Sequence, residues 1–120
     1  MRSARIRLRS ADLLYPTEGA NEAVIELLQE ASERFLKAYL ISRGWKLRKI
    51  HDLGALVAEA VQLDPRFSVF EDFADSLTDR FWAQHYPGGE LDDTWQDYPA
   101  LRQAVGELVD LIEAALALDE

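Results

Sequence analysis

GANEAVIELLQEASERFLKAYLISRG, residues 19–44, carries the strongest structural signal in the chain. Its apolar residues recur at intervals of three and four, the period at which side chains share one face of an α-helix. Gly44 is the expected end of that helix, because glycine readily adopts the left-handed conformation that closes helices. The pattern predicts a long amphipathic helix over residues 19–43. Its inward stripe is expected to comprise Val24, Leu27, Leu28, Ala31, Phe35, Ala38 and Tyr39. Its solvated side is expected to carry Glu22, Glu26, Glu30, Glu33 and Arg34.

A shorter helix is predicted before this one, over residues 3–14. Ile6, Leu13 and Leu14 are its large apolar residues and are expected to anchor it. Tyr15-Pro16 is expected to end it, since the residue before a proline avoids the α region.

Three further helices are predicted after Gly44. The first covers about residues 52–62, with Asp52 as its N-cap. The second follows Pro65, because proline suits the first turn of a helix, and stops before Tyr86-Pro87-Gly88-Gly89. The third covers roughly residues 99–118 and follows an acidic loop over residues 90–97. Their expected inward residues are Leu53, Leu56, Val57 and Ala60, then Phe70, Phe73, Ala74, Leu77 and Phe81, and finally Leu101, Val105, Leu108, Ile112 and Ala115.

No segment alternates with the period of two that marks a strand. The sequence therefore predicts a single all-α domain over residues 1–120: an antiparallel, up-and-down four-helix bundle with one additional short helix. The apolar faces of the second and fourth helices are wide. Such wide faces suggest a further buried surface, which a homodimer would supply. The alternative is that both faces pack only within the monomer.

The composition excludes several classes of protein. The chain has no cysteine, so it has neither disulfides nor thiolate metal sites. No apolar run approaches the roughly 18 residues needed to cross a bilayer, so no membrane association is expected. The N-terminus, MRSARIRLRS, is basic but lacks the apolar core of a secretory signal. A cytoplasmic location is expected by default.

The net charge of −9 is unevenly distributed. Residues 1–50 carry ten basic and six acidic side chains, whereas residues 51–120 carry three basic and sixteen acidic ones. This balance opposes non-specific nucleic-acid binding, because phosphate contacts need cationic surface. Any RNA chemistry must use a local positive patch. The alternative is that the acidic helix faces only keep a small protein soluble.

Two blocks of sequence carry a resemblance to a known family. The first is LLQEASERFLKAYLISRG, residues 27–44, and the second is the triplet His51-Asp52-Leu53 that opens the next helix. A third segment, His85-Tyr86-Pro87, stands where related sequences often have Arg-Tyr-Pro. Together these blocks resemble the HEPN family over most of residues 10–115. The matching positions of the first block are Gln29, Ala31, Glu33, Leu36, Lys37, Ala38, Leu40 and Gly44.

The resemblance implies a helical bundle that pairs as a homodimer. Many HEPN proteins are the toxin-like half of a toxin–antitoxin pair whose partner is a minimal nucleotidyltransferase. Many are metal-independent ribonucleases with an Arg-x4–6-His motif at the dimer interface, and others are modules that bind a nucleotide or a partner. Arg80 and His85 in this chain fit Arg-x4-His.

The resemblance gives Arg80 and His85 catalytic roles. His85 would act as general base on an RNA 2′-hydroxyl or as general acid to the leaving oxygen, since its unperturbed pKa lies near neutrality. Arg80 would neutralise the charge that develops on the phosphate. Five residues advance about 140° round an ideal helix, so the helix must end near His85 or two subunits must contribute. The alternative is an exposed, salt-bridging Arg80 and a helix-capping His85.

A second candidate site surrounds the basic connector after Gly44. Lys37, Arg48, Lys49 and His51 are candidate contacts to a nucleotide or an RNA phosphate at the start of the third helix, where backbone N–H groups point outwards. The structural alternative, which we favour, is that His51 holds the connector by a hydrogen bond across the bundle. No metal site is expected, because neither histidine stands three residues after a glutamate as in di-iron bundles. No cofactor is expected either.

These observations favour a toxin-like HEPN protein that cleaves RNA between two subunits. The alternative is a non-catalytic HEPN module that binds a nucleotide or a minimal nucleotidyltransferase partner.

Overall fold

The computed structural model of the protein describes residues 2–18, 22–46, 49, 52–75 and 94–117. Its elements in chain order are α1 (Arg2–Glu18), α2 (Glu22–Ser42), α3 (Leu53–Leu63), the 3-10 helix η1 (Pro65–Phe70) and α5 (Thr94–Ala117). Helical geometry continues from η1 through residues 71–75. No strand occurs among these residues, which confirms the predicted all-α class. None of the described helices is long and apolar enough to cross a membrane.

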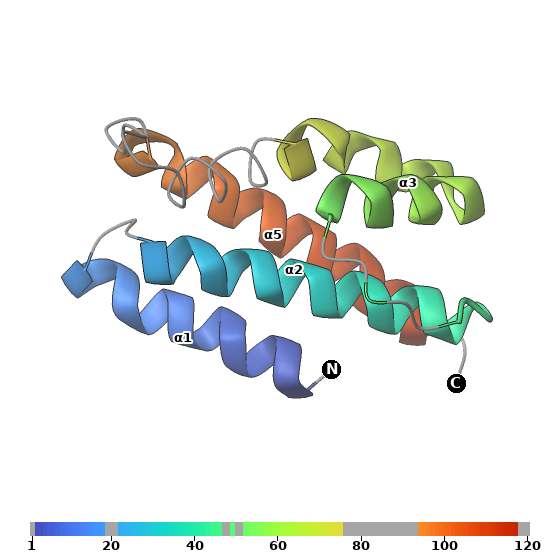
Figure 1. The fold of residues 1–120 in the computed structure, drawn as a ribbon, viewed down its shortest axis with the longest axis horizontal. Coiled ribbons are helices and arrows are strands. Elements are labelled where there is room, and N and C mark those ends of the chain that lie inside the picture. Colours follow the sequence, from blue (N-terminus) through green and yellow to red (C-terminus); the bar gives the residue numbers. More distant parts are fainter. Residues whose placement is uncertain (1, 19–21, 47–48, 50–51, 76–93, 118–120) are drawn as a thin grey trace.

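Helix α2 lies at the centre of the molecule and packs against α1, α3 and α5 (Figure 1). Helix α1 runs antiparallel to α2, and α5 runs along α2 in the same direction. Helix α3 also starts near the middle of α2 and runs in the same direction as α2 (Figure 1). Strict alternation of direction, which defines an up-and-down bundle, therefore does not hold for the pair α2 and α3.

The C-terminus of α2 ends as the sequence predicts. Gly44 has a φ of 91°, in the left-handed region. The N–H of Gly44 donates to the carbonyl of Ile41, and the N–H of Trp45 donates to the carbonyl of Leu40, both at 3.0 Å. This pair of bonds is the Schellman arrangement, which satisfies carbonyls that have no partner within the helix. Leu40 is fully buried, and Trp45 packs partly against the core.

The inward face of α2 is broader than the predicted stripe. Ile25, Leu36 and Leu40 are fully buried in addition to Phe35. One prediction was wrong: Glu33 is not on the solvated side but is 9% exposed. It tolerates burial because Lys37 lies one turn away and donates to its carboxylate at 2.8 Å. The fully buried side chains of the helix include Val24, Ile25, Leu28, Ala31, Phe35, Leu36 and Leu40.

The predicted anchors of α1 were wrong. Ile6 is 54% exposed and Leu13 is 68% exposed, whereas Ala4 and Ala11 are buried. Leu8 and Tyr15 pack against the core beside these alanines. The residues that face inward therefore follow the spacing i, i+4, i+7, i+11, but two of the four are small. Small side chains allow the axes of two helices to approach closely, so α1 packs against α2 without burying its largest residues.

Two prolines do not mark helix boundaries as predicted: Pro16 was expected to end a helix and Pro99 to begin one. Pro16 lies inside α1, which continues to Glu18, and Pro99 lies inside α5, which begins at Thr94 rather than after the proline. Each proline lacks an N–H and disfavours the α region in the residue before it. Those preceding residues are Tyr15 and Tyr98, whose rings stack with centroids 3.9 Å apart and planes at 14°. Tertiary stacking between α1 and α5 thus outweighs the local preference at both positions.

Helix α3 matches its prediction closely. Asp52 is the N-cap, and its Oδ1 accepts from the N–H of Gly54 at 2.9 Å and of Ala55 at 3.4 Å. The four residues predicted to face inward are all fully buried: Leu53, Leu56, Val57 and Ala60.

The next helix differs from its prediction because it opens with 3-10 geometry. Asp64 caps η1 by accepting from the N–H of Arg66 at 3.0 Å, and Pro65 occupies the first turn. A 3-10 helix has three residues per turn, so side chains three apart align. Phe67 and Phe70 have that spacing within η1 and are both buried. Phe73, in the α-helical turn that follows, is also buried.

Helix α5 completes the core. Its predicted stripe is confirmed, since Leu101, Val105, Leu108, Ile112 and Ala115 are all buried. Ion pairs join it to α1 at two levels: Arg102 bonds both carboxylate oxygens of Asp12 at 2.7 and 3.0 Å, and Arg5 pairs with Glu113 at 2.9 Å. These pairs are partly exposed, so each contributes at most about 1 kcal/mol.

Candidate functional site

The predicted catalytic pair lies outside the described residues. Arg80 and His85 both fall in residues 76–93, and the candidate phosphate contacts Arg48 and His51 are likewise outside. The structure does describe the residues that flank the first segment. For this part of the chain, the structure describes only the packing of these flanking residues.

Both flanks of the segment are anchored in the core. Before it, Phe73 and Ala74 are buried. After it, Tyr98 is 3% exposed and stacks on Tyr15. Burial and, to a smaller extent, the nearby Asp12 carboxylate raise the pKa of Tyr98 to about 12. The phenol is therefore neutral at physiological pH and serves as a packing group rather than as a base.

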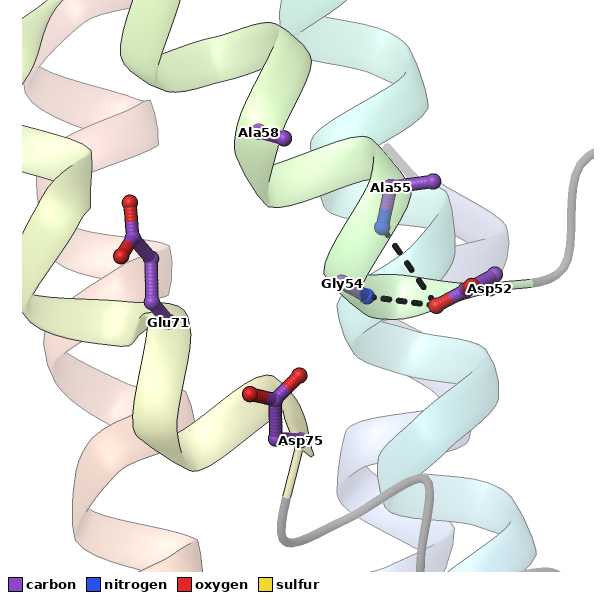
Figure 2. A pocket seen from close by; sticks show the side chains of 6 residues that line it. All are labelled: Asp52, Gly54, Ala55, Ala58, Glu71 and Asp75. Atoms are coloured by element: carbon purple, nitrogen blue, oxygen red, sulfur yellow. Dashed lines mark hydrogen bonds between the residues drawn. The ribbon is translucent and has the colours of Figure 1, made fainter.

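An acidic hollow of about 480 Å³ lies between the N-terminus of α3 and residues 71–75. Figure 2 shows Glu71 and Asp75 on one side of the hollow and Asp52 on the other, with Asp52 bonded to Gly54 and Ala55. The hollow is lined by Asp52, Gly54, Ala55, Ala58, Glu71 and Asp75. In sequence it adjoins His51 on one side and the segment that begins at residue 76 on the other.

The hollow bears directly on the predicted anion site at the start of α3. The free N–H groups of a helix N-terminus attract anions. Here Asp52 already accepts from two of them. The carboxylate of Asp75 also comes close to Gly54, in the first turn of α3. A Cβ at this glycine would lie only 3.2 Å from Oδ1 of Asp75, so the absence of a side chain permits the approach. Two carboxylates therefore occupy the positive end of the α3 dipole, and a phosphate placed in this hollow would meet negative charge.

The described part of the hollow does not form a metal site. No group of three or more histidine, cysteine, aspartate or glutamate side chains comes close enough to hold a metal ion in the described ranges. The carboxylates of the hollow thus provide a negative surface rather than a ligand set.

Lys37 occupies a position that the sequence did not reveal. Its Nζ donates to Oε1 of Glu33 at 2.8 Å, and the two side chains are only 15% and 12% exposed. Gln29, one turn earlier on the same line of α2, is also buried, and its Oε1 has no hydrogen-bond partner among the described residues. Gln29, Glu33 and Lys37 form a polar line within a largely apolar helix. Their spacing of i, i+4, i+8 was the signal from which this line was predictable.

The remaining described residues of the basic connector are more open. Lys49 is exposed, so its ammonium group is accessible to an anionic ligand. Trp45 packs partly against the core, and its Nε1 is buried without a partner in the described structure. Lys37 and Lys49 therefore stand in different environments, one paired within the bundle and one in solvent. A joint role for them with Arg48 and His51 stays a prediction.

Comparison with known proteins identifies one family. The family model of the HEPN domain matches residues 1–115. No curated protein and no solved structure matches the chain. The match covers α1, α2, α3, η1, the segment that holds Arg80 and His85, and almost all of α5.

Proposed function

Since the chain belongs to the HEPN family, we propose that it is a metal-independent RNA endonuclease that works as a homodimer. In this proposal it is the toxin-like member of a toxin–antitoxin pair, and its partner is a minimal nucleotidyltransferase. The observation that carries the proposal is the Arg-x4-His spacing of Arg80 and His85 inside the region matched by the family.

The proposed reaction is an internal transfer at phosphorus. The RNA 2′-oxygen attacks the adjacent phosphorus as His85 accepts its proton, and the bond from phosphorus to the 5′-oxygen breaks. The products are a 2′,3′-cyclic phosphate and a 5′-hydroxyl, which takes up a proton. Arg80 holds the non-bridging oxygens and stabilises the charge that develops on them.

A homodimer suits this reaction because it brings two copies of each residue to one cleft. One His85 can then accept the proton of the 2′-hydroxyl while the other protonates the leaving oxygen. Exposed apolar residues on α2, α3 and η1 are consistent with a further buried surface, since Ile41, Leu63 and Val69 are all at least 47% exposed.

The charge distribution favours RNA binding at some surfaces of the protein and opposes it at others. The hollow formed by Asp52, Glu71 and Asp75 repels phosphate at the base of the flanking helix. The exposed Lys49 provides positive charge on the connector between α2 and α3. RNA is therefore expected to avoid the acidic hollow, and weak binding to bulk nucleic acid is expected at physiological salt.

The proposal is tested by expressing the chain alone in bacteria and following growth and the integrity of total RNA. Wild type is expected to arrest growth and degrade RNA, whereas Arg80→Ala and His85→Ala are expected to do neither. Arg34→Ala is the matched control, because Arg34 is an exposed cation on α2 that the proposed chemistry does not use. Normal growth and intact RNA with the wild type would contradict the proposal.

That contradictory result would favour the non-catalytic alternative, a module that binds a nucleotide or the nucleotidyltransferase. The alternative predicts that millimolar ATP raises the melting temperature, since a ligand that binds only the folded state stabilises it. An unchanged melting temperature and no complex with a nucleotidyltransferase would exclude this alternative as well.

A further inference from the structure

Helix α1 presents a continuous outward face that nothing in the described structure covers. We define this face, the α1 stripe, by Arg2, Ile6, Arg9 and Leu13, all of which are exposed. At 100° per residue these four positions fall within an arc of about 60° on the helix surface. The opposite side of α1 holds the buried Ala4 and Ala11, and α1 packs on α2 (Figure 1). The stripe therefore points away from the bundle.

The spacing of the stripe is that of a helix–helix seam. Its residues are separated by four, three and four positions, which is the alternation that keeps a line of contacts facing a second helix. An open hollow of about 330 Å³ lies among Arg2, Arg5, Ile6 and Arg9. The aliphatic stems of arginine side chains contribute apolar surface to such a hollow while their guanidinium groups remain in water. A side chain from a partner helix fits a depression of this kind.

No described residue neutralises the charge of the two arginines of the stripe. Arg5 pairs with Glu113 and Arg7 pairs with Glu30, both at the edges of α1. Arg2 and Arg9 form no ion pair with any described residue. The first turn of α1 also contains no acidic side chain to offset the positive end of the helix dipole. A basic and apolar line thus stands on a chain whose net charge is −9.

The composition of the stripe selects among possible occupants. A second copy that docked through the same stripe would place arginines against arginines with no carboxylate between them. A nucleic-acid backbone would leave Ile6 and Leu13 against phosphate, and the stripe has no aromatic residue to stack on a base. An anionic membrane would attract the two arginines, but the stripe offers only Ile6 and Leu13 as large apolar side chains for insertion.

We propose that the α1 stripe is a docking surface for an acidic amphipathic α-helix of a partner protein. In that complex the apolar residues of the partner contact Ile6 and Leu13, and its carboxylates contact Arg2 and Arg9. The docked face is remote in sequence from Arg80 and His85. The inference does not rest on the proposed ribonuclease function, and either can hold without the other.

The test uses a designed probe, a fluorescein-labelled three-heptad helix with leucine on one stripe and glutamate beside it. A second peptide has lysine in place of every glutamate. Fluorescence anisotropy with the full-length protein is expected to show about tenfold tighter binding of the glutamate peptide, because complementary charge favours one partner and like charge disfavours the other. Arg9→Glu is expected to weaken that binding about tenfold. Ile6→Ser is expected to weaken it as well.

Arg34→Glu is the matched control, since it makes the same charge change on the exposed side of α2. It should leave binding of the glutamate peptide unchanged, and circular dichroism should show the same helix content in all variants. Equal binding of the two peptides would overturn the proposal. So would equal weakening by Arg9→Glu and Arg34→Glu, which indicates a general charge effect. Binding to duplex RNA or to phosphatidylserine vesicles that Arg9→Glu abolishes, without binding of the peptide, would also overturn it.

Discussion

Helices α1 and α2 are neighbours with opposite relations between residue size and burial. In α2 the large apolar residues face the core, and Phe35, Leu36 and Leu40 are fully buried. In α1 the small residues Ala4 and Ala11 are buried, whereas Ile6 and Leu13 face solvent. Periodicity therefore identifies a helix but does not by itself identify its inward face. When two stripes of one helix are both partly apolar, the stripe that permits the closer approach can be the buried one.

Phe35→Ala has the largest expected effect, because Phe35 is fully buried among α2 and its neighbours. Loss of the ring removes buried apolar surface and leaves a cavity, so we expect the free energy of unfolding to fall by roughly 3–5 kcal/mol. Urea unfolding followed by circular dichroism measures this change. A fall of less than about 1 kcal/mol would show that α2 does not bury this face.

Gly44→Ala should have the next largest effect, at the point where α2 ends. A Cβ at residue 44 meets no atom within 4 Å, so the cost comes only from the φ of 91°. We expect a loss of about 1–2 kcal/mol in the free energy of unfolding.

Gly106→Ala is the matched control inside α5, where the new Cβ meets only Nη1 of Arg102 at 3.3 Å. That variant should gain up to about 1 kcal/mol from helix propensity. Equal effects of the two substitutions would argue against a left-handed end to α2.

Tyr98→Phe tests how α5 holds α1 in place. The hydroxyl of Tyr98 is buried and has no partner among the described residues, while its ring stacks on Tyr15. Removing the hydroxyl keeps the stack, so we expect no loss of stability and a gain of up to about 1 kcal/mol. A loss of more than about 1 kcal/mol, measured in urea, would show that the hydroxyl is bonded in solution.

The same residue predicts a dependence on pH. The pKa of Tyr98 rises from 10.0 to about 12 on folding, mainly through burial. The folded state therefore holds the phenol proton more tightly than the unfolded chain. This contribution to stability is fully present below pH 10 and is lost as the pH rises through 12. Between pH 10 and pH 12 the free energy of unfolding of wild type should therefore fall relative to that of Tyr98→Phe. A difference between the two that stays constant over this range would contradict the burial of Tyr98.

Ile6→Ala and Leu13→Ala should have the smallest effects. Both side chains are more than half exposed, so each substitution should change the free energy of unfolding by no more than about 0.5 kcal/mol. Measured beside Phe35→Ala, these variants sharpen the contrast between α1 and α2. A loss above about 2 kcal/mol for either would show that the stripe is buried in solution, as it would be in a stable dimer formed through α1.

Local patterns predicted the parts of the fold in which local and tertiary preferences agree. The cap at Asp52, the end at Gly44 and the stripes of α3 and α5 are cases of this kind. The extents of α1 and α5 were not predictable in the same way, because the stack of Tyr15 on Tyr98 outweighs the preference set by the prolines that follow them. That contact joins residues far apart in the sequence.

The candidate site also combines features that local sequence predicts with features that depend on tertiary packing. Arg80 and His85 were found from their spacing, and their geometry stays a prediction because they lie outside the described residues. The pairing of Lys37 with Glu33 and the approach of Asp75 to the N-terminus of α3 depend on burial and on tertiary packing. The i, i+4 spacing signals the pairing of Lys37 with Glu33 but not its burial, and no local pattern signals the approach of Asp75. Both change where an anionic ligand is expected to bind.

The most direct test of the proposed function is cleavage of total bacterial RNA by the purified protein in the presence of EDTA, with sequencing of the new 3′ ends. We expect cleavage by wild type with 2′,3′-cyclic phosphate ends, no cleavage by His85→Ala, and unchanged cleavage by Arg34→Ala. An intact RNA sample with wild type, or cleavage that His85→Ala leaves unchanged, would contradict the assignment of Arg80 and His85 as a ribonuclease site.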